Sequence, residues 1–496
     1  MQLDHRPAQP APELPHDEPQ LPSGAERRGV LVYMGVSALV IVLMVVFGLL
    51  MRMAQGQTIH MSPTLFYQIM TVHGAGAVGI VGLGSTAIMW YFLRQYVKLG
   101  LGVLYTTLAM FVVGVASILV SVFVGGFAGA WTFLFPLPAT SMGLWDQTAA
   151  AGFLGGLLLV GASFLLLYVD AARAILARYG SLANALGWPQ ILGLKDGYGP
   201  PPAVVASCMA IISDTVGLTA GASVLVMSLV NLYNPTFAID PLLAKSLTYF
   251  FGHVFVNVTI YKAVIAVYEL LPRYTNRPWK SNRAFLISWN CSTALVILVF
   301  PHHLLMDFVL PPWMLMMGEI ASWINGLPIL CVTAYGALMI VYRSGMRWNL
   351  ASSLLFLSMF GWAAGVIPAI IDGTIVINQV MHNTLWVPGH FHFYLILGEV
   401  SMLFGFMYYL TSLAGNAKET WLDRSSFVAY VVGGLGIAFT FLYSGLESVP
   451  RRYATHLPQW QGYDRLGAVA AVLVVAAVLV FVTRFLTSLR AIDRAA

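Results

Sequence analysis

Six of the eleven histidines in this chain lie inside long apolar stretches. They are His73, His253, His302, His303, His390 and His392. An imidazole is costly in such surroundings unless something binds it, and ionisable groups in lipid-spanning helices are functional-site candidates by default. Because histidine is also the commonest metal ligand, this set indicates a metal or haem centre.

The spacing of these histidines separates them into pairs and singles. His302 and His303 are adjacent, and His390 and His392 are two residues apart. On a helix of 3.6 residues per turn, residues two apart point about 200° from each other, so His390 and His392 face opposite flanks. One helix can therefore bind two different cofactors. A lone buried histidine is more often a hydrogen-bonded core residue, but six of them favour ligands.

Composition identifies the chain as a polytopic membrane protein. Hydrophobic residues make up 59% of its 496 positions and charged residues only 9%, whereas about 25% are charged in a soluble globular protein. The net charge of +5 would suggest anionic partners in a soluble protein. In a membrane protein basic residues mark cytoplasmic loops instead, so we expect membrane lipid as a partner and no nucleic acid.

Apolar windows of about 20 residues, the length that crosses the hydrocarbon core, predict an all-α bundle of twelve transmembrane helices. The predicted spans lie near residues 30–52, 66–94, 101–125, 148–172, 203–232, 245–271, 284–309, 314–342, 349–371, 386–412, 425–445 and 464–488. Residues 1–28 carry six prolines and few large apolar residues, which predicts a disordered cytoplasmic tail without a signal peptide. We expect residues 29–490 to form one twelve-helix membrane domain that binds the cofactors.

Lys and Arg residues occupy alternate connections between the predicted helices, and the intervening connections are nearly free of them. Under the positive-inside rule this places both termini in the cytoplasm, as in a multi-pass protein of a bacterial or archaeal inner membrane. All six histidines then share one layer, roughly 10 Å below the outer surface at 1.5 Å rise per residue. Separate packing accidents would have no reason to share a depth.

One outer loop breaks the charge pattern, because Arg451 and Arg452 lie on the side where basic pairs are disfavoured. One explanation is that translocation tolerated the pair. The other is a docking site for a buried carboxylate or phosphate, which guanidinium groups bind bidentately.

Five motifs together carry a resemblance to a known family. They are Thr-Val-His-Gly at 71–74, Gly-His at 252–253, Pro-His-His at 301–303, Met-His-Asn-Thr-Leu-Trp-Val-Pro-Gly-His-Phe-His at 381–392 and Pro-Arg-Arg at 450–452. In these five motifs the chain resembles subunit I of the haem-copper oxidoreductase superfamily. The 381–392 segment is most similar to the B-type oxidases. The resemblance covers all twelve predicted helices and implies a low-spin haem, a high-spin haem and one copper ion.

The resemblance implies a role for each histidine. His73 and His392 would be the axial ligands of the low-spin haem, and His390 would be the proximal ligand of the high-spin haem. The copper ion facing that haem would be bound by three residues: His253, His302 and His303. Three neutral imidazoles suit copper and leave a coordination position free for substrate.

The resemblance also implies contacts to the haem periphery. Arg451 and Arg452 would pair with haem propionates, and His382 and Asn383 would belong to the same region. Five glycines follow the first histidine: Gly74, Gly76, Gly79, Gly82 and Gly84. They either leave room for a flat macrocycle or serve plain helix packing.

The chain departs from the family at the position of a redox-active tyrosine. Oxygen-reducing B-type members carry this tyrosine four residues after the first copper ligand, where this chain has Asn257. The C-type position, six residues before the His-His pair, is Val296. Tyr261, two turns after His253, is a further candidate, but about 12 Å along the helix separates it from that ligand, which favours packing or a proton path.

The missing tyrosine changes the expected substrate. Four-electron reduction of O2 is hard without it, whereas coupling two NO molecules needs only two electrons and two protons. We therefore expect a nitric oxide reductase that converts NO to N2O, with Asn257 hydrogen-bonded to a bound nitrogen oxide or a copper-bound water. The alternative is a cytochrome c oxidase subunit I that reduces O2 to water with proton translocation. A transporter is a distant alternative, because the chain lacks the internal repeat usual in transporters.

Electrons must come from another protein. The three cysteines, Cys208, Cys291 and Cys331, form no C-x-x-C-H motif for covalent haem and no paired ligand set. We expect cytochrome c as the electron donor and a second subunit that contains a cupredoxin or cytochrome c domain.

Several ionisable residues lie inside predicted helices and would be costly if unpaired, among them Asp214, Lys262, Glu319 and Glu399. Lys262 and Tyr261, with Thr333 and Tyr335, are candidates for the start of a cytoplasmic proton path. Snorkelling of Lys262 toward the inner interface is equally compatible with the sequence.

Overall fold

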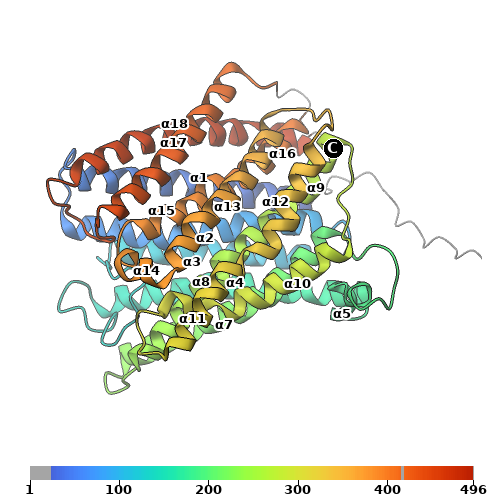
Figure 1. The fold of residues 1–496 in the computed structure, drawn as a ribbon. Coiled ribbons are helices and arrows are strands. Elements are labelled where there is room, and N and C mark those ends of the chain that lie inside the picture. The colour runs from blue at the N-terminus through green and yellow to red at the C-terminus, as the bar shows by residue number, and fades with distance from the viewer. Residues whose placement is uncertain (1–23, 415–417, 495–496) are drawn as a thin grey trace, which may run out of the picture.

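The computed structural model describes residues 24–414 and 418–494, which form a bundle of long helices running side by side (Figure 1). Twelve spans in this described part are long and apolar enough to cross a membrane, which confirms the predicted all-α, twelve-span fold. Eight spans are single helices: α1 Gly24–Gln55, α2 Pro63–Leu93, α3 Leu101–Phe123, α4 Gln147–Tyr179, α7 Pro202–Tyr233, α13 Leu350–Gly373, α17 Trp421–Leu446 and α18 Gln461–Arg494. Three short helices lie in the connections: α5 Leu182–Ala185, α6 Trp188–Ile191 and α14 Ile375–Met381.

The other four spans are interrupted. They consist of α8 Pro241–Ala263 with α9 Ile265–Thr275, α10 Arg283–Leu298 with the 3₁₀ turn η1 Phe300–Leu304, α11 Pro312–Asn325 with α12 Leu327–Val341, and α15 Trp386–His392 with the π-helix η2 Phe393–Val400 and α16 Ser401–Ser412. The sequence predicts each of them as one continuous helix. Hydropathy averaged over a membrane-length window does not reveal the interruptions, because each of these spans remains apolar as a whole.

The seventh span ends as an α-helix earlier than predicted. The sequence predicts a helix over residues 284–309, but α10 ends at Leu298, and His302 and His303 lie on η1. Pro301 explains the difference, because proline has no N–H for the helical ladder and its ring clashes with the preceding turn. The two histidines are consequently held on a tight turn.

The first and last helices extend beyond their predicted boundaries. α1 begins at Gly24, inside the predicted tail, and α18 ends at Arg494, past the predicted end of the membrane domain. A hydrogen bond joins the two added segments, since Arg27 Nη2 donates to the Asp493 carbonyl oxygen at 2.7 Å. The remainder of the predicted tail, residues 1–23, lies outside the described residues.

Side-chain caps define where several helices begin. Asp146, Asp240 and Asn282 each accept a hydrogen bond from the backbone N–H three residues later, at 2.7, 2.7 and 2.9 Å. These caps satisfy amide groups that the first helical turn leaves free. At the end of α4, Gly180 takes a φ of 75°, the left-handed conformation that commonly terminates a helix.

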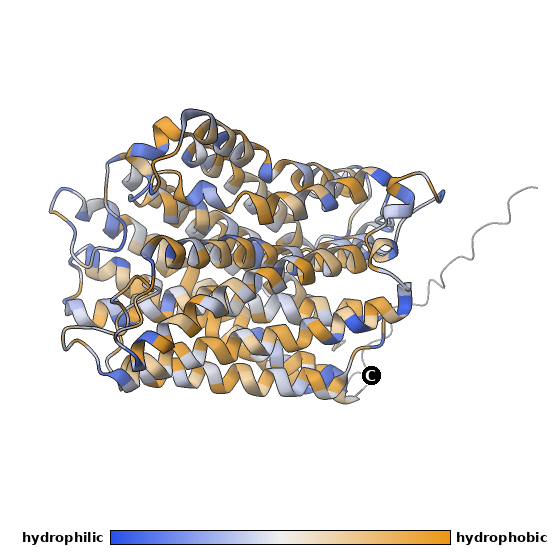
Figure 2. Ribbon diagram, turned by 90° about the horizontal axis from the view of Figure 1, so that it is seen from below, coloured by the Kyte–Doolittle hydropathy of each residue, from blue (hydrophilic) through white to orange (hydrophobic). Residues whose placement is uncertain are grey.

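Hydropathy divides the bundle into an apolar body and two polar ends. Figure 2 shows hydrophobic residues along the long helices and hydrophilic residues gathered at both ends and in the connections. In Figure 1, α14 lies at one end of the bundle and α5 at the other.

The three spans that carry His73, His253, His390 and His392 are the most buried. In Pro63–Leu93, Pro241–Thr275 and Trp386–Ser412, 82%, 83% and 83% of the apolar window is buried, and no other described span exceeds 50%. Helices enclosed by other helices can carry polar side chains that lipid would not tolerate. The fold therefore places these histidines in the centre of the bundle.

Candidate metal centre

A cavity of about 640 Å³ lies inside the bundle. Five of the six predicted ligands line it: His73, His253, His303, His390 and His392. They reach it from four separate elements, α2, α8, η1 and α15. Its volume falls within the range of about 300–1,000 Å³ that is typical of sites for small organic ligands and cofactors.

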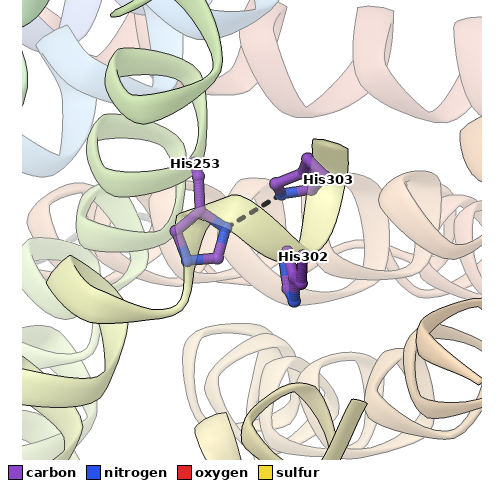
Figure 3. A group of neighbouring side chains, drawn as sticks. All are labelled: His253, His302 and His303. Carbon is purple, nitrogen blue, oxygen red and sulfur yellow. Dashed lines mark hydrogen bonds between the residues drawn. The ribbon is translucent and has the colours of Figure 1, made fainter. Parts of the chain in front are cut away.

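The sixth predicted ligand, His302, joins His253 and His303 in a compact cluster (Figure 3). One ring nitrogen of each lies within 4.8 Å of the others, and His253 Nδ1 is 2.9 Å from His303 Nε2. Two nitrogens bound to one metal ion at about 2.0 Å would lie about 2.8–3.3 Å apart for bond angles between square and tetrahedral values. His253 and His303 thus already have the spacing of two ligands of one ion, and the third ring lies within 4.8 Å of both.

A serine sets the protonation of His302. Ser322 Oγ donates its one proton to the Gly318 carbonyl oxygen at 2.7 Å, and it lies 2.9 Å from His302 Nδ1. Because the hydroxyl proton is already engaged, Ser322 accepts from His302 Nδ1–H. His302 Nε2 is then the unprotonated atom, as a metal ligand requires.

Backbone carbonyl oxygens determine which ring nitrogen is protonated in His73 and His392. His73 Nδ1 lies 3.0 Å from the Met44 carbonyl oxygen, and His392 Nδ1 lies 2.6 Å from the Pro388 carbonyl oxygen. A carbonyl only accepts, so each Nδ1 carries the proton and each Nε2 is free to ligate. Gly48 gives His73 its space, because an added Cβ there would lie 3.2 Å from His73 Cε1.

His390 and His392 contact different parts of the bundle. The His392 ring packs on Phe441 of α17 with centroids 4.8 Å apart, whereas His390 Nδ1 lies 3.9 Å from Asp372 Oδ2 at the end of α13. Within the described residues, His390 Nδ1 is buried and has no hydrogen-bond partner. Asp372 is therefore a carboxylate available to orient that ring.

Arg451 and Arg452 both line the cavity. The Arg451 backbone N–H donates to the Asn383 carbonyl oxygen at 2.9 Å, and its Nη2 donates to Asn383 Oδ1 at 3.3 Å. Its Nε is buried without a partner among the residues described, which leaves an N–H for an anion. Burial, and then the charge of Arg451, lower the pKa of the neighbouring His382. These contacts favour the docking explanation for the outer arginine pair.

Asn257 and Tyr261 have different surroundings. Asn257 lines the cavity, and its Nδ2 donates to the His253 carbonyl oxygen at 2.6 Å. Tyr261 does not contribute to the cavity wall and packs on Trp289 with ring centroids 4.9 Å apart. The structure therefore brings Asn257, and not Tyr261, to the histidines. Three other tyrosines line the cavity: Tyr249, Tyr394 and Tyr430.

The glycines that follow His73 chiefly admit the protein's own side chains. An added Cβ would lie 2.1 Å from the Trp131 ring at Gly74 and 2.5 Å from the Met44 sulfur at Gly76. Of the five glycines, Gly74 alone contributes to the cavity wall. Helix packing is therefore their main role.

The residues predicted to start a proton path have different surroundings. Lys262 is fully buried and pairs with Asp214 at 2.8 Å, so snorkelling is excluded. Thr333 is hydrogen-bonded to Tyr268 at 2.6 Å, while Tyr335 is 63% exposed. Lys262 and Thr333 thus belong to two different hydrogen-bonded groups.

Sequence reasoning missed three residues beside the predicted ligands: Gly48, which leaves room for His73, Ser322 at His302, and Asp372 near His390. Each is distant in sequence from the histidine that it serves and belongs to no ligand motif. A buried ion pair at the cavity wall, Arg52 with Asp464 at 2.8 Å, was also missed. Its only sequence signal is a charged residue near one end of each of two apolar windows.

The donor set fits the cofactors that the resemblance implies. Three neutral imidazoles in one cluster are a copper-type donor set. His73 and His392 each have a free Nε2 in the same cavity, as two axial haem ligands would need, and His390 remains for a second haem. The free N–H of Arg451 suits a propionate.

Comparison with known proteins relates the chain to terminal oxidases. The family model for Cytochrome C and Quinol oxidase polypeptide I matches residues 28–479. Cytochrome c oxidase subunit 1 of Thermostichus vulcanus is 24% identical over 384 residues, 75% of this chain and 66% of that protein. Cytochrome c oxidase polypeptide 1 of Halobacterium salinarum is 27% identical over 259 residues, 51% of this chain and 42% of that protein. The chain therefore spans less than two thirds of the length of these two relatives.

Two further matches cover more of the chain. Cytochrome c oxidase subunit 1 of Synechocystis is 25% identical over 455 residues, 88% of this chain and 78% of that protein. A heme-copper terminal oxidase dimer solved by cryo-EM has the same fold, with a TM-score of 0.75 and 21% identity over 96% of this chain and 85% of that chain. Because the family model matches residues 28–479, most of the chain and the range that contains all six histidines and both arginines, the chain belongs to the Cytochrome C and Quinol oxidase polypeptide I family.

Proposed function

We propose that this protein is the catalytic subunit of a membrane-bound haem-copper oxidoreductase that reduces NO to N2O. Two haems would supply electron transfer, and the second haem with copper would supply gas binding and reduction. His73 and His392 would hold the low-spin haem, and His390 the high-spin haem. The copper ligands would be His253, His302 and His303.

One observation carries the choice of NO. Asn257 lies in the cavity wall one helical turn from His253, where B-type oxygen-reducing members of the superfamily carry a tyrosine. An amide can hydrogen-bond a bound nitrogen oxide, but it cannot give up an electron and a proton together. Joining two NO molecules needs two electrons and two protons, so the reaction does not require such a donor.

O2 reduction is the second candidate. The relatives described above are named cytochrome c oxidase subunit 1, and Tyr249 and Tyr394 line the cavity as possible hydrogen donors. The Tyr249 ring lies against His303 with centroids 5.7 Å apart. If O2 is the substrate, its reduction to water should be accompanied by proton translocation, which has to be measured separately. A transporter function is less well supported, because five histidines line the cavity, as a metal or haem centre would need.

Electrons would reach the low-spin haem from cytochrome c, through a second subunit that contains a cupredoxin or cytochrome c domain. The polar ends and apolar body of the bundle support a membrane location, and we propose the inner membrane of a bacterial or archaeal cell. The charge pattern of the loops places both termini in the cytoplasm on this proposal.

Gas turnover by the purified complex tests the substrate. With reduced cytochrome c under anaerobic conditions, we expect an NO electrode to record consumption and gas chromatography to detect one N2O for every two NO. His390→Ala should abolish turnover and the high-spin haem spectrum. Rapid O2 consumption without NO turnover would establish the oxidase instead.

A further inference from the structure

Glu399 places a carboxyl group in the wall of the cavity. It lies on η2 and is 3% exposed. Thr259 Oγ1 lies 2.8 Å from Glu399 Oε2 and 2.6 Å from the Val256 carbonyl oxygen. Glu399 Oε1 is buried without a hydrogen-bond partner in the described part of the chain. A half-satisfied carboxyl group in an apolar interior is costly, which marks it as a candidate for function.

The backbone that carries Glu399 is unusual. η2 follows directly after His392 and is a π-helix, in which hydrogen bonds run from i to i+5 and each turn holds an extra residue. The widened turn fits against α13 at Gly361, where an added Cβ would lie 2.2 Å from the Leu397 carbonyl carbon. Such turns are frequent at functional sites because they redirect side chains. This one presents Glu399 to the cavity and to Thr259.

A second cluster of buried polar side chains lies near Glu399. Lys262 Nζ donates to Asp214 Oδ2 at 2.8 Å and to Tyr168 Oη at 2.5 Å, and the Tyr168 hydroxyl donates to Asp214 Oδ2 at 2.7 Å. Lys262 follows Thr259 by three residues on α8, so the two lie on one helix face about 5–6 Å apart. Lys262 and Asp214 also interact electrostatically with Glu399. The two clusters thus form one series of titratable groups leading to the cavity.

We propose that Glu399 donates protons to the gas-reducing centre and that the Lys262, Asp214 and Tyr168 cluster restores its proton. This inference rests on the proposed NO reduction, in which two NO, two electrons and two protons give N2O and water. One N–N bond forms and one N–O bond breaks, and the departing oxygen takes up both protons. The electrons come from cytochrome c. Asn257 cannot supply the protons, because an amide does not ionise in this range.

Glu399→Gln tests the donor, with Glu319→Gln as the matched control. Glu319 is also a carboxylate within a membrane span, but its Oε1 accepts from the Ile375 N–H and it does not line the cavity. Fully reduced holoenzyme is mixed with NO while haem absorbance and a pH-indicator dye are recorded. We expect Glu399→Gln to slow proton uptake about 10²-fold or more, with unchanged haem spectra and metal content. Glu319→Gln should match the wild type.

An infrared measurement gives a readout independent of turnover. The redox-induced difference spectrum of the wild type should contain a protonated-carboxyl band that shifts in D2O. This band should be absent from Glu399→Gln and present in Glu319→Gln. Because no gas is added, the band tests Glu399 even if the wild type leaves NO unreduced, an outcome that would overturn the proposed function by itself.

Glu399→Asp separates acid chemistry from packing. An acid at this position, although shorter, should recover part of the proton-uptake rate that Gln loses. The inference is overturned if Glu399→Gln takes up protons at the wild-type rate, if it keeps the infrared band, or if Asp performs no better than Gln.

Discussion

His253 Nδ1 lies 2.9 Å from His303 Nε2, although 50 residues separate the two in the chain. This is the separation expected for two ligands of one metal ion. α8 supplies one ring and the 3₁₀ turn η1 supplies the other, so the packing of these two elements brings the donors together. The remaining requirement is that each ring presents its unprotonated nitrogen.

Ser322→Ala tests how His302 meets this requirement. Without the serine oxygen, His302 Nδ1–H loses its acceptor, and we expect copper affinity to fall about 10–100-fold. Copper retained per protein against a competing chelator measures the effect. Ser223→Ala is the control, because that exposed serine makes the same kind of bond, to the Thr219 carbonyl oxygen at 2.8 Å, away from the cavity. Equal copper affinity in the two variants would contradict the assigned tautomer.

Gly48→Ala tests whether the space at Gly48 determines the position of the His73 ring. The added methyl would lie 3.2 Å from His73 Cε1, so the ring must move by a few tenths of an ångström. We expect altered optical and paramagnetic resonance spectra of the low-spin haem. Gly35→Ala on the same helix meets only Leu486 at 3.9 Å and should keep the spectra while gaining about 0.5–1 kcal/mol from helix propensity. Unaltered spectra in both variants would place His73 outside the haem site.

Lys262→Met tests the buried pair with Asp214. Removal of the ammonium leaves a fully buried carboxylate without its cation, and we expect the free energy of unfolding to decrease by about 3–5 kcal/mol. Thermal denaturation in detergent, followed by haem absorbance, measures the loss. The double variant Lys262→Met with Asp214→Asn should regain most of the stability, because no uncompensated charge remains. A double variant as unstable as the single one would show that packing, not charge, dominates here.

Arg451→Gln tests the proposed propionate site. Loss of a half-buried cation beside a haem favours the oxidised iron, so we expect a reduction potential lower by about 60 mV, equivalent to about 1.4 kcal/mol for one electron. Spectroelectrochemical titration measures the change. Arg465→Gln is the control, because Arg465 donates to the Gly56 carbonyl oxygen and does not line the cavity. Identical potentials in the two variants would remove Arg451 from the site.

Much of the fold could be predicted because hydropathy is a local property. Each apolar window long enough to cross the membrane must form a helix, since lipid offers no partner for backbone groups. The breaks in the spans could not be predicted in this way. Pro301 signals one of them, but the π-helix at Phe393–Val400 packs closely against Gly361 of another helix, a contact that the local sequence does not reveal.

The sequence by itself determined the class of fold, the six candidate ligands and the absence of a tyrosine at position 257, because these follow from residue type and short spacing. Only the tertiary structure decided which nitrogen of His302 is free, that Tyr261 lies away from the cavity and that Glu399 lies in its wall. Those features depend on contacts between segments far apart in the chain. Hydrogen-bond partners and shared cavities arise only when the helices pack together.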